Sequence, residues 1–324
     1  MRVLGKVIRG GRVESIHRIE AIVVNRDQEF LFETEQPEYQ TYIRSSAKPF
    51  QVYPLVESGA ADAYDLTPAE LALCCASHNG EEIHVNTVRN IHKRTGVHRE
   101  QLLCGIHNPM DTETAESLLK SNETITEYHN NCSGKHTGML LACKHQGFPT
   151  DDYIDPAHPL QRQIREYLES IIGRQGVEVG IDGCSVPTFY MSLKELAIGF
   201  QRLAGEVDPY LDTIYYAMTS EPYMVAGKNR FDTDFMQAVN GSVVSKVGAE
   251  GVRGLGIRRN GDTYGLALKV LDGSKRVSAA AALHIMEMLG WFNPADYPDL
   301  ESYYAPEITN HRGVHVGRVA IEII

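Results

Sequence analysis

Two residues near the N-terminus, Ser45 and Lys48, have the types and the spacing of a nucleophile and its base. They lie in the stretch R-S-S-A-K-P, which forms residues 44–49. Residues i and i+3 lie on the same side of a helical turn, so the hydroxyl and the amine can come within hydrogen-bond distance. An amine that has lost its proton can remove the serine proton and make the oxygen a nucleophile. The pair predicts acyl-transfer chemistry, although Ser-x-x-Lys also occurs by chance on solvated helix faces.

Pro49 determines where the neighbouring helix can begin. A proline ring clashes with the carbonyl four residues earlier, and it disfavours the helical region for the residue before it. Proline is well tolerated in the first helical turn. We therefore expect a helix that starts near Lys48 and Pro49, with Ser45 in the loop that leads into it.

Strand-forming segments gather at the two ends of the chain, and helix-forming segments gather in the middle. Hydrophobic patterning predicts strands at 3–8, 19–24, 265–270 and 316–323, with Asn260-Gly261 as a hairpin turn. Thr67-Pro68-Ala69-Glu70 has the pattern of a capped helix start. We expect an α+β fold with one antiparallel sheet built from both chain ends and an inserted helical subdomain. The expected bounds are 1–60 with 176–324 for the sheet domain, and 61–175 for the helical subdomain.

Small polar residues fill the segment C-A-S-H-N-G-E at 75–81, between two predicted helices. Ser77, His78, Asn79 and Gly80 can direct a hydroxyl, side-chain nitrogens and backbone N–H groups into a cleft. The alternative is a plain turn between helices.

Cationic residues in glycine-containing turns form a further candidate group. Lys228 and Arg230 lie in V-A-G-K-N-R-F at 225–231, and Lys246 and Glu250 lie in K-V-G-A-E-G at 246–251. Such cations suit the recognition of a carboxylate. Ordinary solvated surface charge is the competing interpretation for each of them.

Two cysteines lie in polar segments that could bind a ligand. Cys132 and Lys135 belong to N-N-C-S-G-K-H-T-G at 130–138, at a helix start where free backbone N–H groups can bind an anion. Asp182 and Cys184 follow a predicted strand in D-G-C-S. Cys132 and Cys184 could form a metal site or be buried, inert thiols, since no C-x-x-C supports the pairing. No H-E-x-x-H is present, so a protease-type zinc is not expected.

Composition excludes several classes of protein. The 324-residue chain has a net charge of −11, which argues against nucleic acid and anionic membranes as partners. No apolar run reaches the roughly 20 residues of a membrane span, and the first residues do not resemble a signal peptide. Six scattered cysteines suggest reduced thiols rather than a disulfide framework. We therefore expect a cytoplasmic protein.

Six motifs in one order carry a resemblance to a known family. They are R-S-S-A-K-P-F-Q, C-A-S-H-N-G-E, C-G-x-H-x-P, N-N-C-S-G-K-H-T-G-M, D-G-C-S-V-P and K-x-G-A-E-G-V. Together they span nearly the whole chain, which resembles the Rhizobium-etli-type (class 3) L-asparaginases. The resemblance implies a fold like that of serine β-lactamases and glutaminases. It also implies hydrolysis of L-asparagine to L-aspartate and ammonia.

The resemblance also implies roles for individual residues. Ser45 and Lys48 match the family's Ser-Lys pair, and Ser77 matches its second catalytic serine. Lys246 matches a further catalytic lysine, with Lys269 as the alternative. The residues that match the family's zinc position are Cys132, Lys135 and Cys184, with Asp182 adjacent. A homodimer is expected.

In the expected mechanism, Lys48 takes the proton of Ser45, which attacks the side-chain amide carbon of asparagine. Arg44, Lys228 and Arg230 are candidates to bind the substrate carboxylate, and Asp182 or Glu250 its ammonium group. A zinc ion would order the site.

Three alternatives remain open. A penicillin-recognising hydrolase would share the Ser-Lys chemistry, but its K-T-G and S-D-N motifs are absent. A non-catalytic amino-acid-binding module would use the same residues without turnover. Glutaminase activity differs by one methylene, which a pocket rejects by only about 1–3 kcal/mol.

Overall fold

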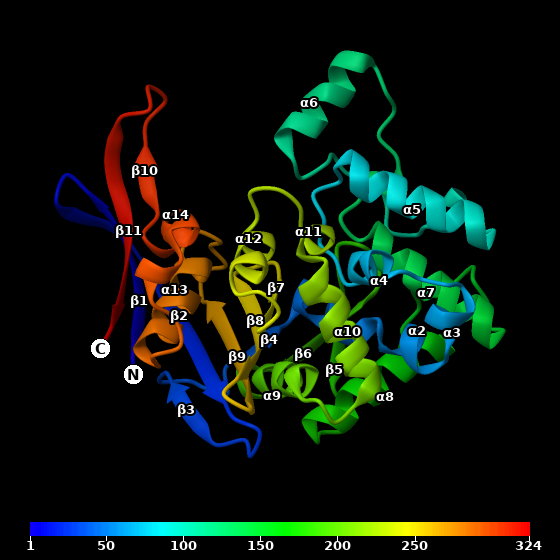
Figure 1. Cartoon of the computed structure of the whole chain (residues 1–324), viewed down its shortest axis with the longest axis horizontal. Helices are drawn as coiled ribbons and strands as arrows, with labels where there is room; N and C mark the ends of the chain where they lie inside the picture. The colour runs from blue at the N-terminus through cyan, green and yellow to red at the C-terminus, as the bar shows by residue number, and fades with distance from the viewer. The chain divides into compact units, whose positions relative to one another are not determined.

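The chain divides into two compact units in the computed structural model, which describes all residues from 1 to 324. The first unit contains Met1–Ser46, Met191–Ala204 and Ser245–Ile324. The second contains Ala47–Tyr190 and Gly205–Val244. The predicted helical segment 61–175 lies wholly within the second unit, which also includes the helices of 47–60 and 205–244. Figure 1 shows the elements coloured along the chain.

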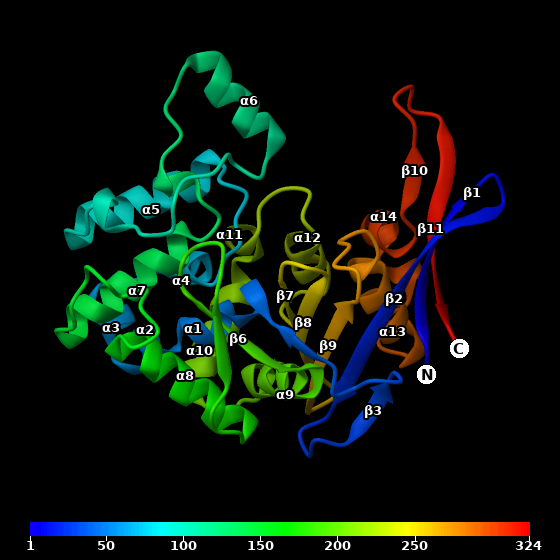
Figure 2. The ribbon, with the colours of Figure 1, turned by 180° about the vertical axis from the view of Figure 1, so that it is seen from behind.

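An antiparallel sheet built from both chain ends is the centre of the first unit, as the sequence predicts. The strand order is β10-β11-β1-β2-β9-β8-β7, with β3 paired to β2. The N-terminal and C-terminal strands pair directly, with Val3 opposite Ile323, and the two termini lie close together in Figures 1 and 2. The strands are β1 (Val3–Arg9), β2 (Arg12–Val24), β3 (Phe30–Glu33), β7 (Val243–Val247), β8 (Val252–Arg259), β9 (Asp262–Val270), β10 (Glu307–Thr309) and β11 (His315–Ile323).

Helices cover both faces of this sheet, and glycines let their backbones approach. A Cβ on Gly265 of β9 would lie 1.8 Å from the carbonyl oxygen of Ala197, so one face accepts α9 at very short range. On the opposite face, a Cβ on Gly5 would lie 2.6 Å from Val277, which precedes α13. The fold is therefore α+β, as expected. The remaining elements of this unit are β4 (Gln40–Tyr42), α9 (Leu193–Ala204), α13 (Ser278–Met288), η4 (Pro294–Asp296), η5 (Pro298–Leu300) and α14 (Glu301–Tyr304).

The predicted hairpin at Asn260-Gly261 joins β8 to β9. Arg259 pairs with Asp262, so the loop has two residues, and both have positive φ, 51° at Asn260 and 78° at Gly261. This is the conformation that Asn-Gly favours in a tight hairpin, because its twist matches that of the flanking strands. The turn therefore fixes the register of two central strands.

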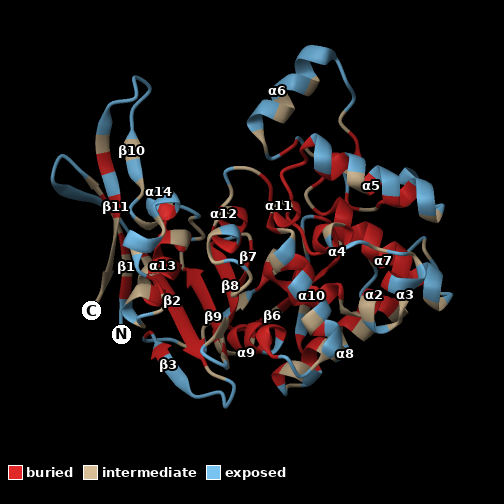
Figure 3. Cartoon of the chain, viewed as in Figure 1, coloured by how far each residue is buried: buried red, intermediate tan, exposed pale blue.

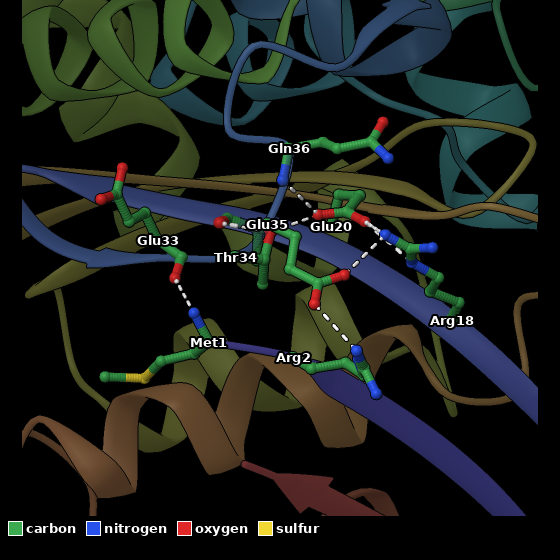
Figure 4. Close-up of polar contacts among 9 residues, drawn as sticks. Met1, Arg2, Arg18, Glu20, Glu33, Thr34, Glu35 and Gln36 are labelled. Atoms are coloured by element: carbon green, nitrogen blue, oxygen red, sulfur yellow. Dashed lines mark hydrogen bonds and ion pairs between the residues drawn. The ribbon is translucent and has the colours of Figure 1, made fainter.

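A buried carboxylate joins β2 to the segment after β3 (Figure 4). Glu20 is almost completely buried and accepts hydrogen bonds from Thr34 Oγ1 at 2.6 Å and Gln36 N at 3.0 Å. Arg18 Nε donates to the same carboxylate at 3.0 Å. Glu35 binds Arg18 and Arg2 at the surface of this network. These bonds satisfy the charge of Glu20, which would otherwise be costly to bury.

The second unit is mainly helical. Its first helix, α1, begins at Lys48 with Pro49 in the first turn, which confirms the predicted start. The predicted capping box is also present, with Thr67 Oγ1 accepting from Glu70 N and the Glu70 carboxylate accepting from Thr67 N. The helices are α1 (Lys48–Gln51), α2 (Tyr53–Glu57), α3 (Ala60–Ala63), α4 (Pro68–Cys74), α5 (Glu82–Thr95), η2 (Arg99–Gln101), α6 (Thr112–Ser121), η3 (Glu127–His129), α7 (Ser133–Gln146), α8 (Pro159–Ile172), α10 (Pro209–Ser220), α11 (Pro222–Val225) and α12 (Phe231–Ala238).

Burial differs sharply among these helices (Figure 3). The first eleven residues of α7 are all buried, whereas α6 buries none of its residues.

The antiparallel pair β5 (Glu178–Ile181) and β6 (Pro187–Ser192) is joined by the turn that contains Cys184. No helix of the structure combines the length and the apolar composition that a membrane crossing requires.

Close packing of α4 against α7 depends on Gly134. A Cβ at this position would lie 2.2 Å from the carbonyl oxygen of Leu73. We expect Gly134→Ala to destabilise the protein by about 1–3 kcal/mol through overpacking, although alanine is the better helix former. Denaturant unfolding measures the effect. Gly183→Ala is the control, because no atom lies within 4 Å of its added Cβ. An unchanged unfolding midpoint for Gly134→Ala would contradict this packing.

A neutral histidine joins α5 to α7 and makes stability depend on pH. His92 is buried and hydrogen-bonds through Nε2 to Thr137 Oγ1 at 2.9 Å. Burial lowers the pKa of His92 to about 4, from an ordinary value of 6.5. Between these two values the unfolded chain binds more protons than the folded one, so stability falls as the pH decreases from 6.5 to 4.

The expected contribution of His92 is about 1 kcal/mol per pH unit near pH 5, since about one extra proton binds on unfolding. His92→Gln can retain a hydrogen bond to Thr137 and has no titrating group. Urea unfolding of both proteins at pH 5 and 7.5 should show a smaller pH dependence for the variant. An equal dependence would show that His92 is not held neutral.

Candidate active site

Lys48 lies at the start of α1, with its amine in a buried, polar pocket. Its Nζ lies 2.5 Å from the Ala76 carbonyl oxygen, 2.9 Å from Ser77 Oγ and 3.3 Å from the Asn131 carbonyl oxygen. Ser77 follows α4 and is held by its backbone N–H, which donates to Val225 O at 3.0 Å. Lys48 and Ser77 are only 1% and 4% exposed. The fold thus brings together one predicted amine and one predicted hydroxyl that are distant in sequence.

The amine of Lys48 is held in one place by several acceptors. Its Nζ donates to the Ala76 and Asn131 carbonyl oxygens and to Ser77 Oγ. An amine held within hydrogen-bond distance of a serine hydroxyl has the geometry that a general base requires.

Ser45, the predicted nucleophile, belongs to the first unit. It lies in the short turn η1 (Arg44–Ala47), immediately before α1, as the position of Pro49 predicts. Its neighbour Arg44 has a φ of +52°, in the left-handed region that a long side chain rarely adopts. Strain of this kind is often found at functional sites. Ser45 itself is partly exposed.

The two lysines considered for the second catalytic position both lie on strands of the first unit. Lys246 on β7 is fully buried, and its Nζ donates to Val247 O at 3.0 Å. Lys269 on β9 is also buried, and it donates to Val270 O at 3.0 Å and to the carbonyl oxygen of Glu250. Burial lowers the pKa of Lys269. Glu250 has a φ of +59°, and its carbonyl is already used by Lys269.

The three predicted metal ligands come together in the second unit. Cys132 directly precedes α7, Lys135 lies in its first turn, and Cys184 lies in the turn between β5 and β6. Lys135 Nζ lies 3.1 Å from Cys184 Sγ, and all three residues are buried. Asp182 is partly exposed, and its Oδ1 accepts from Gly183 N at 2.7 Å.

The pKa values of the two thiols are shifted in opposite directions. A hydrogen bond from Cys184 lowers the pKa of the Cys132 thiol, and the cationic forms of Lys48 and Lys135 add to this effect against the penalty of burial. The same hydrogen bond and burial raise the pKa of Cys184. Cys132 is therefore the more acidic of the two thiols. Because Lys48 also interacts with Cys132, the two candidate groups form one continuous cluster.

Cys132, Lys135 and Cys184 offer two sulfur atoms and one nitrogen as possible metal ligands. No group of three or more histidine, cysteine, aspartate or glutamate side chains in the structure is arranged to bind a metal. A metal at this cluster would need the Lys135 amine as its third ligand. The two cysteine sulfurs and the amine nitrogen are donor types that a zinc ion accepts. A lysine binds a metal only after losing its proton, so pH should affect binding.

His78 and Gly80 shape the turn that contains Ser77. The Gly80 N–H donates to His78 Nδ1 at 3.0 Å, and His78 Nε2 lies 3.0 Å from Ser133 Oγ. Both ring nitrogens therefore have protein partners, and burial lowers the pKa of His78 well below its ordinary value. A Cβ at Gly80 would lie 2.8 Å from the carbonyl oxygen of His129. Through these contacts, His78 and Gly80 hold the backbone of the turn that contains Ser77 in place.

The two cations of the loop after α11 have different partners. Arg230 Nη1 donates to Asn79 Oδ1 at 2.7 Å and lies 3.5 Å from the Ser77 carbonyl oxygen. Lys228 Nζ forms ion pairs with Glu113 Oε2 at 2.6 Å and Asp111 Oδ2 at 3.5 Å. Of the two cations, Arg230 is therefore the one placed beside Ser77.

Several groups at this site escaped the sequence analysis. The Ala76 and Asn131 carbonyls are backbone acceptors, which no residue type reveals. His136 Nδ1 lies 2.6 Å from Tyr153 OH, and burial lowers its pKa to about 4. Glu81 accepts three hydrogen bonds from the segments around Asn79 and Arg230. His136 and Glu81 both lie inside the motifs quoted above, which was the available signal.

Comparison with known proteins gives one broad match. A family model described as L-asparaginase II matches residues 6–321. No curated protein matches the chain.

Solved structures give weaker likenesses. The crystal structure of Mglu in its native form in the presence of 4.3 M NaCl has a TM-score of 0.47 and 11% identity over 85% of this chain. The chain spans 62% of the length of Mglu. A β-lactamase candidate from Bacteroides dorei DSM 17855 has a TM-score of 0.43 and 13% identity, covering 78% of this chain and 85% of its own.

Proposed function

We propose that this chain, which belongs to the L-asparaginase II family of amidohydrolases, hydrolyses L-asparagine to L-aspartate and ammonia through a Ser-Lys acyl-enzyme mechanism. The observation that best supports the mechanism is the buried amine of Lys48, 2.9 Å from Ser77 Oγ. Two backbone carbonyls accept further hydrogen bonds from Nζ, so the amine is held beside a serine hydroxyl.

In the first step, Ser45 is the nucleophile and Lys48 the general base. Lys48 takes the Ser45 proton, and the Ser45 oxygen bonds to the side-chain amide carbon of asparagine. Lys48 then gives this proton to Ser77, which it contacts, as Ser77 passes its own proton to the departing nitrogen, and the nitrogen leaves as ammonia. In the second step, water attacks the resulting ester and releases aspartate. The buried amine of Lys246 or Lys269 is the candidate for the second proton relay.

Substrate recognition needs groups for the α-carboxylate and the α-ammonium of asparagine. Arg230 is proposed for the carboxylate because it lies beside the Ser77 carbonyl. Arg44 is a further cationic candidate, and Asp182 and Glu250 are acidic candidates for the ammonium.

Ammonia release from asparagine and glutamine, measured side by side, tests the proposed activity. We expect release from asparagine. Binding of asparagine without ammonia would favour an amino-acid-binding module, and faster release from glutamine would favour a glutaminase. Cleavage of a coloured cephalosporin would identify a penicillin-recognising hydrolase.

Cys132, Lys135 and Cys184 are proposed as the ligands of a zinc ion. Such an ion would order the cluster beside Lys48. We expect metal analysis of the purified protein to find zinc, with less bound at lower pH as Lys135 becomes protonated. Cys184→Ala should lose the metal and unfold at a lower temperature. The matched control is Cys143→Ala, since Cys143 is a buried thiol elsewhere on α7. Equal zinc content in both variants would contradict this assignment.

The cytoplasmic location and the homodimer remain predictions. Light scattering at several protein concentrations measures the oligomeric state, and a monomer throughout would contradict the second prediction.

A further inference from the structure

The buried carboxylate of Glu81 lies between two segments of the candidate site. Its Oε1 accepts from Asn79 Nδ2 and from Lys228 N, both at 3.0 Å, and its Oε2 accepts from Tyr223 OH at 2.5 Å. The approach of the second segment requires a glycine, because a Cβ on Gly227 would lie 2.2 Å from Glu81 Oε1. Gly227 also has a φ of +106°. The close contact is therefore built into the backbone.

Glu81 determines which way the Asn79 amide points. The Asn79 nitrogen has two acceptors, Glu81 Oε1 and the Lys228 carbonyl oxygen, each at 3.0 Å. An NH₂ group donates two hydrogen bonds, so both donors are used there. The amide oxygen must then lie on the other side, where Arg230 Nη1 donates to it at 2.7 Å. A reversed amide would place a donor against the guanidinium and an oxygen against a carboxylate.

Backbone bonds hold the same two segments in register. Ser77 N donates to Val225 O at 3.0 Å, and Asn79 N donates to Ala226 O at 2.9 Å. The guanidinium of Arg230 consequently lies 3.5 Å from the Ser77 carbonyl oxygen. The carboxylate of Glu81 thus contacts the Asn79 amide, and this amide contacts the guanidinium of Arg230 beside Ser77.

From these contacts we propose that Glu81 is a positioning residue, which orients Arg230 through Asn79 to receive the α-carboxylate of the amino-acid substrate. The inference rests on the proposed function, and Glu81 itself does not touch the substrate. A planar guanidinium recognises a carboxylate only when its orientation is fixed. Removing Glu81 should therefore weaken recognition of the carboxylate more than it weakens the chemistry of the amide.

The test compares L-asparagine with 3-aminopropanamide, which is asparagine without its α-carboxylate. We expect wild-type kcat/KM to favour asparagine by about 10- to 100-fold, the range of a charge-assisted hydrogen bond. Glu81→Ala should reduce this preference at least about fivefold, through a higher KM for asparagine, with little change for the analogue.

Two further variants separate positioning from simple loss of structure. Glu81→Gln should retain most of the preference, because its amide oxygen can accept from Asn79 and Lys228 while its NH₂ donates to the Tyr223 oxygen. Glu82→Ala is the matched control, since Glu82 is the next residue and is exposed. Thermal unfolding of each variant verifies that the proteins are folded at the assay temperature. An equal loss on both substrates in Glu81→Ala would overturn the proposal.

Calorimetry with L-aspartate and β-alanine provides the same comparison without turnover. We expect wild type to bind aspartate more tightly, and Glu81→Ala to lose much of that preference. If no amide is hydrolysed and this loss is still seen, the proposed activity is wrong and the role of Glu81 stands. If asparagine is hydrolysed and the preference survives in Glu81→Ala, the role of Glu81 is wrong and the activity stands.

Discussion

Replacing Lys48 with methionine should reduce asparagine turnover by about 10²–10⁴-fold, the usual contribution of a general base. Methionine can fill the volume of the lysine stem, but it cannot accept the serine proton. The change also leaves the Ala76 and Asn131 carbonyls without the amine they now contact, which should cost about 1–3 kcal/mol of stability for each buried group left unsatisfied. Steady-state ammonia release, measured below the unfolding temperature of the variant, gives the effect.

Two further variants test whether the loss of turnover comes from the missing base at position 48. Lys93→Met changes an exposed lysine of α5 and should leave turnover unchanged. Lys48→Ala creates space in the buried site, and added small primary amines should restore part of its activity if Lys48 acts as a base. A Lys48→Met enzyme that retains more than about a tenth of wild-type turnover would exclude the proposed mechanism.

Ser45→Ala should abolish turnover by at least about 10³-fold while the protein still folds and binds asparagine. A serine nucleophile forms the covalent ester, so its loss removes the reaction path rather than one contact within it. Mass spectrometry of acid-quenched wild-type enzyme should find an aspartyl adduct on the peptide that contains Ser45. Substrate binding to the variant, measured by calorimetry, should be retained.

The chain supplies a matched control at the next position. Ser46 is buried, and its Oγ donates to Ile43 O at 2.6 Å, so Ser46→Ala should lower stability and leave kcat largely unchanged. Ser77→Ala should slow turnover without removing the adduct, because Ser77 is proposed to relay a proton. An adduct on Ser77 in place of Ser45 would reverse the two assignments.

Local signals predicted most of what lies near them in the chain. Pro49 correctly marked the start of α1, because the constraint of its ring acts on adjacent residues. The same holds for the Thr67–Glu70 capping box and the Asn260-Gly261 hairpin. Alternating strands at both chain ends predicted the antiparallel sheet, in which β11 pairs with β1. Short strands such as β6 and β7 carried too weak a pattern to be recognised.

The candidate site depended much more on the fold. Residue types identified Lys48 and Ser77 separately, and motif order identified the thiols, but 29 residues separate the amine from the hydroxyl that it contacts. Lys228 resembled a substrate-binding cation, and the structure gives it carboxylate partners that include Glu113, 115 residues away. Such partners follow from packing, which one-dimensional spacing does not encode.

The amino-acid sequence alone thus determined the backbone conformations set by neighbouring residues, the sheet formed from both chain ends, and the membership of the L-asparaginase II family. Only the tertiary structure decided that Lys48 meets Ser77 and two carbonyls, and that Glu81 orients Asn79 toward Arg230. The physical reason is the range of the interactions. Caps, turns and proline constraints act within a few residues, whereas buried hydrogen bonds are satisfied by whichever groups the packed helices bring within about 3 Å.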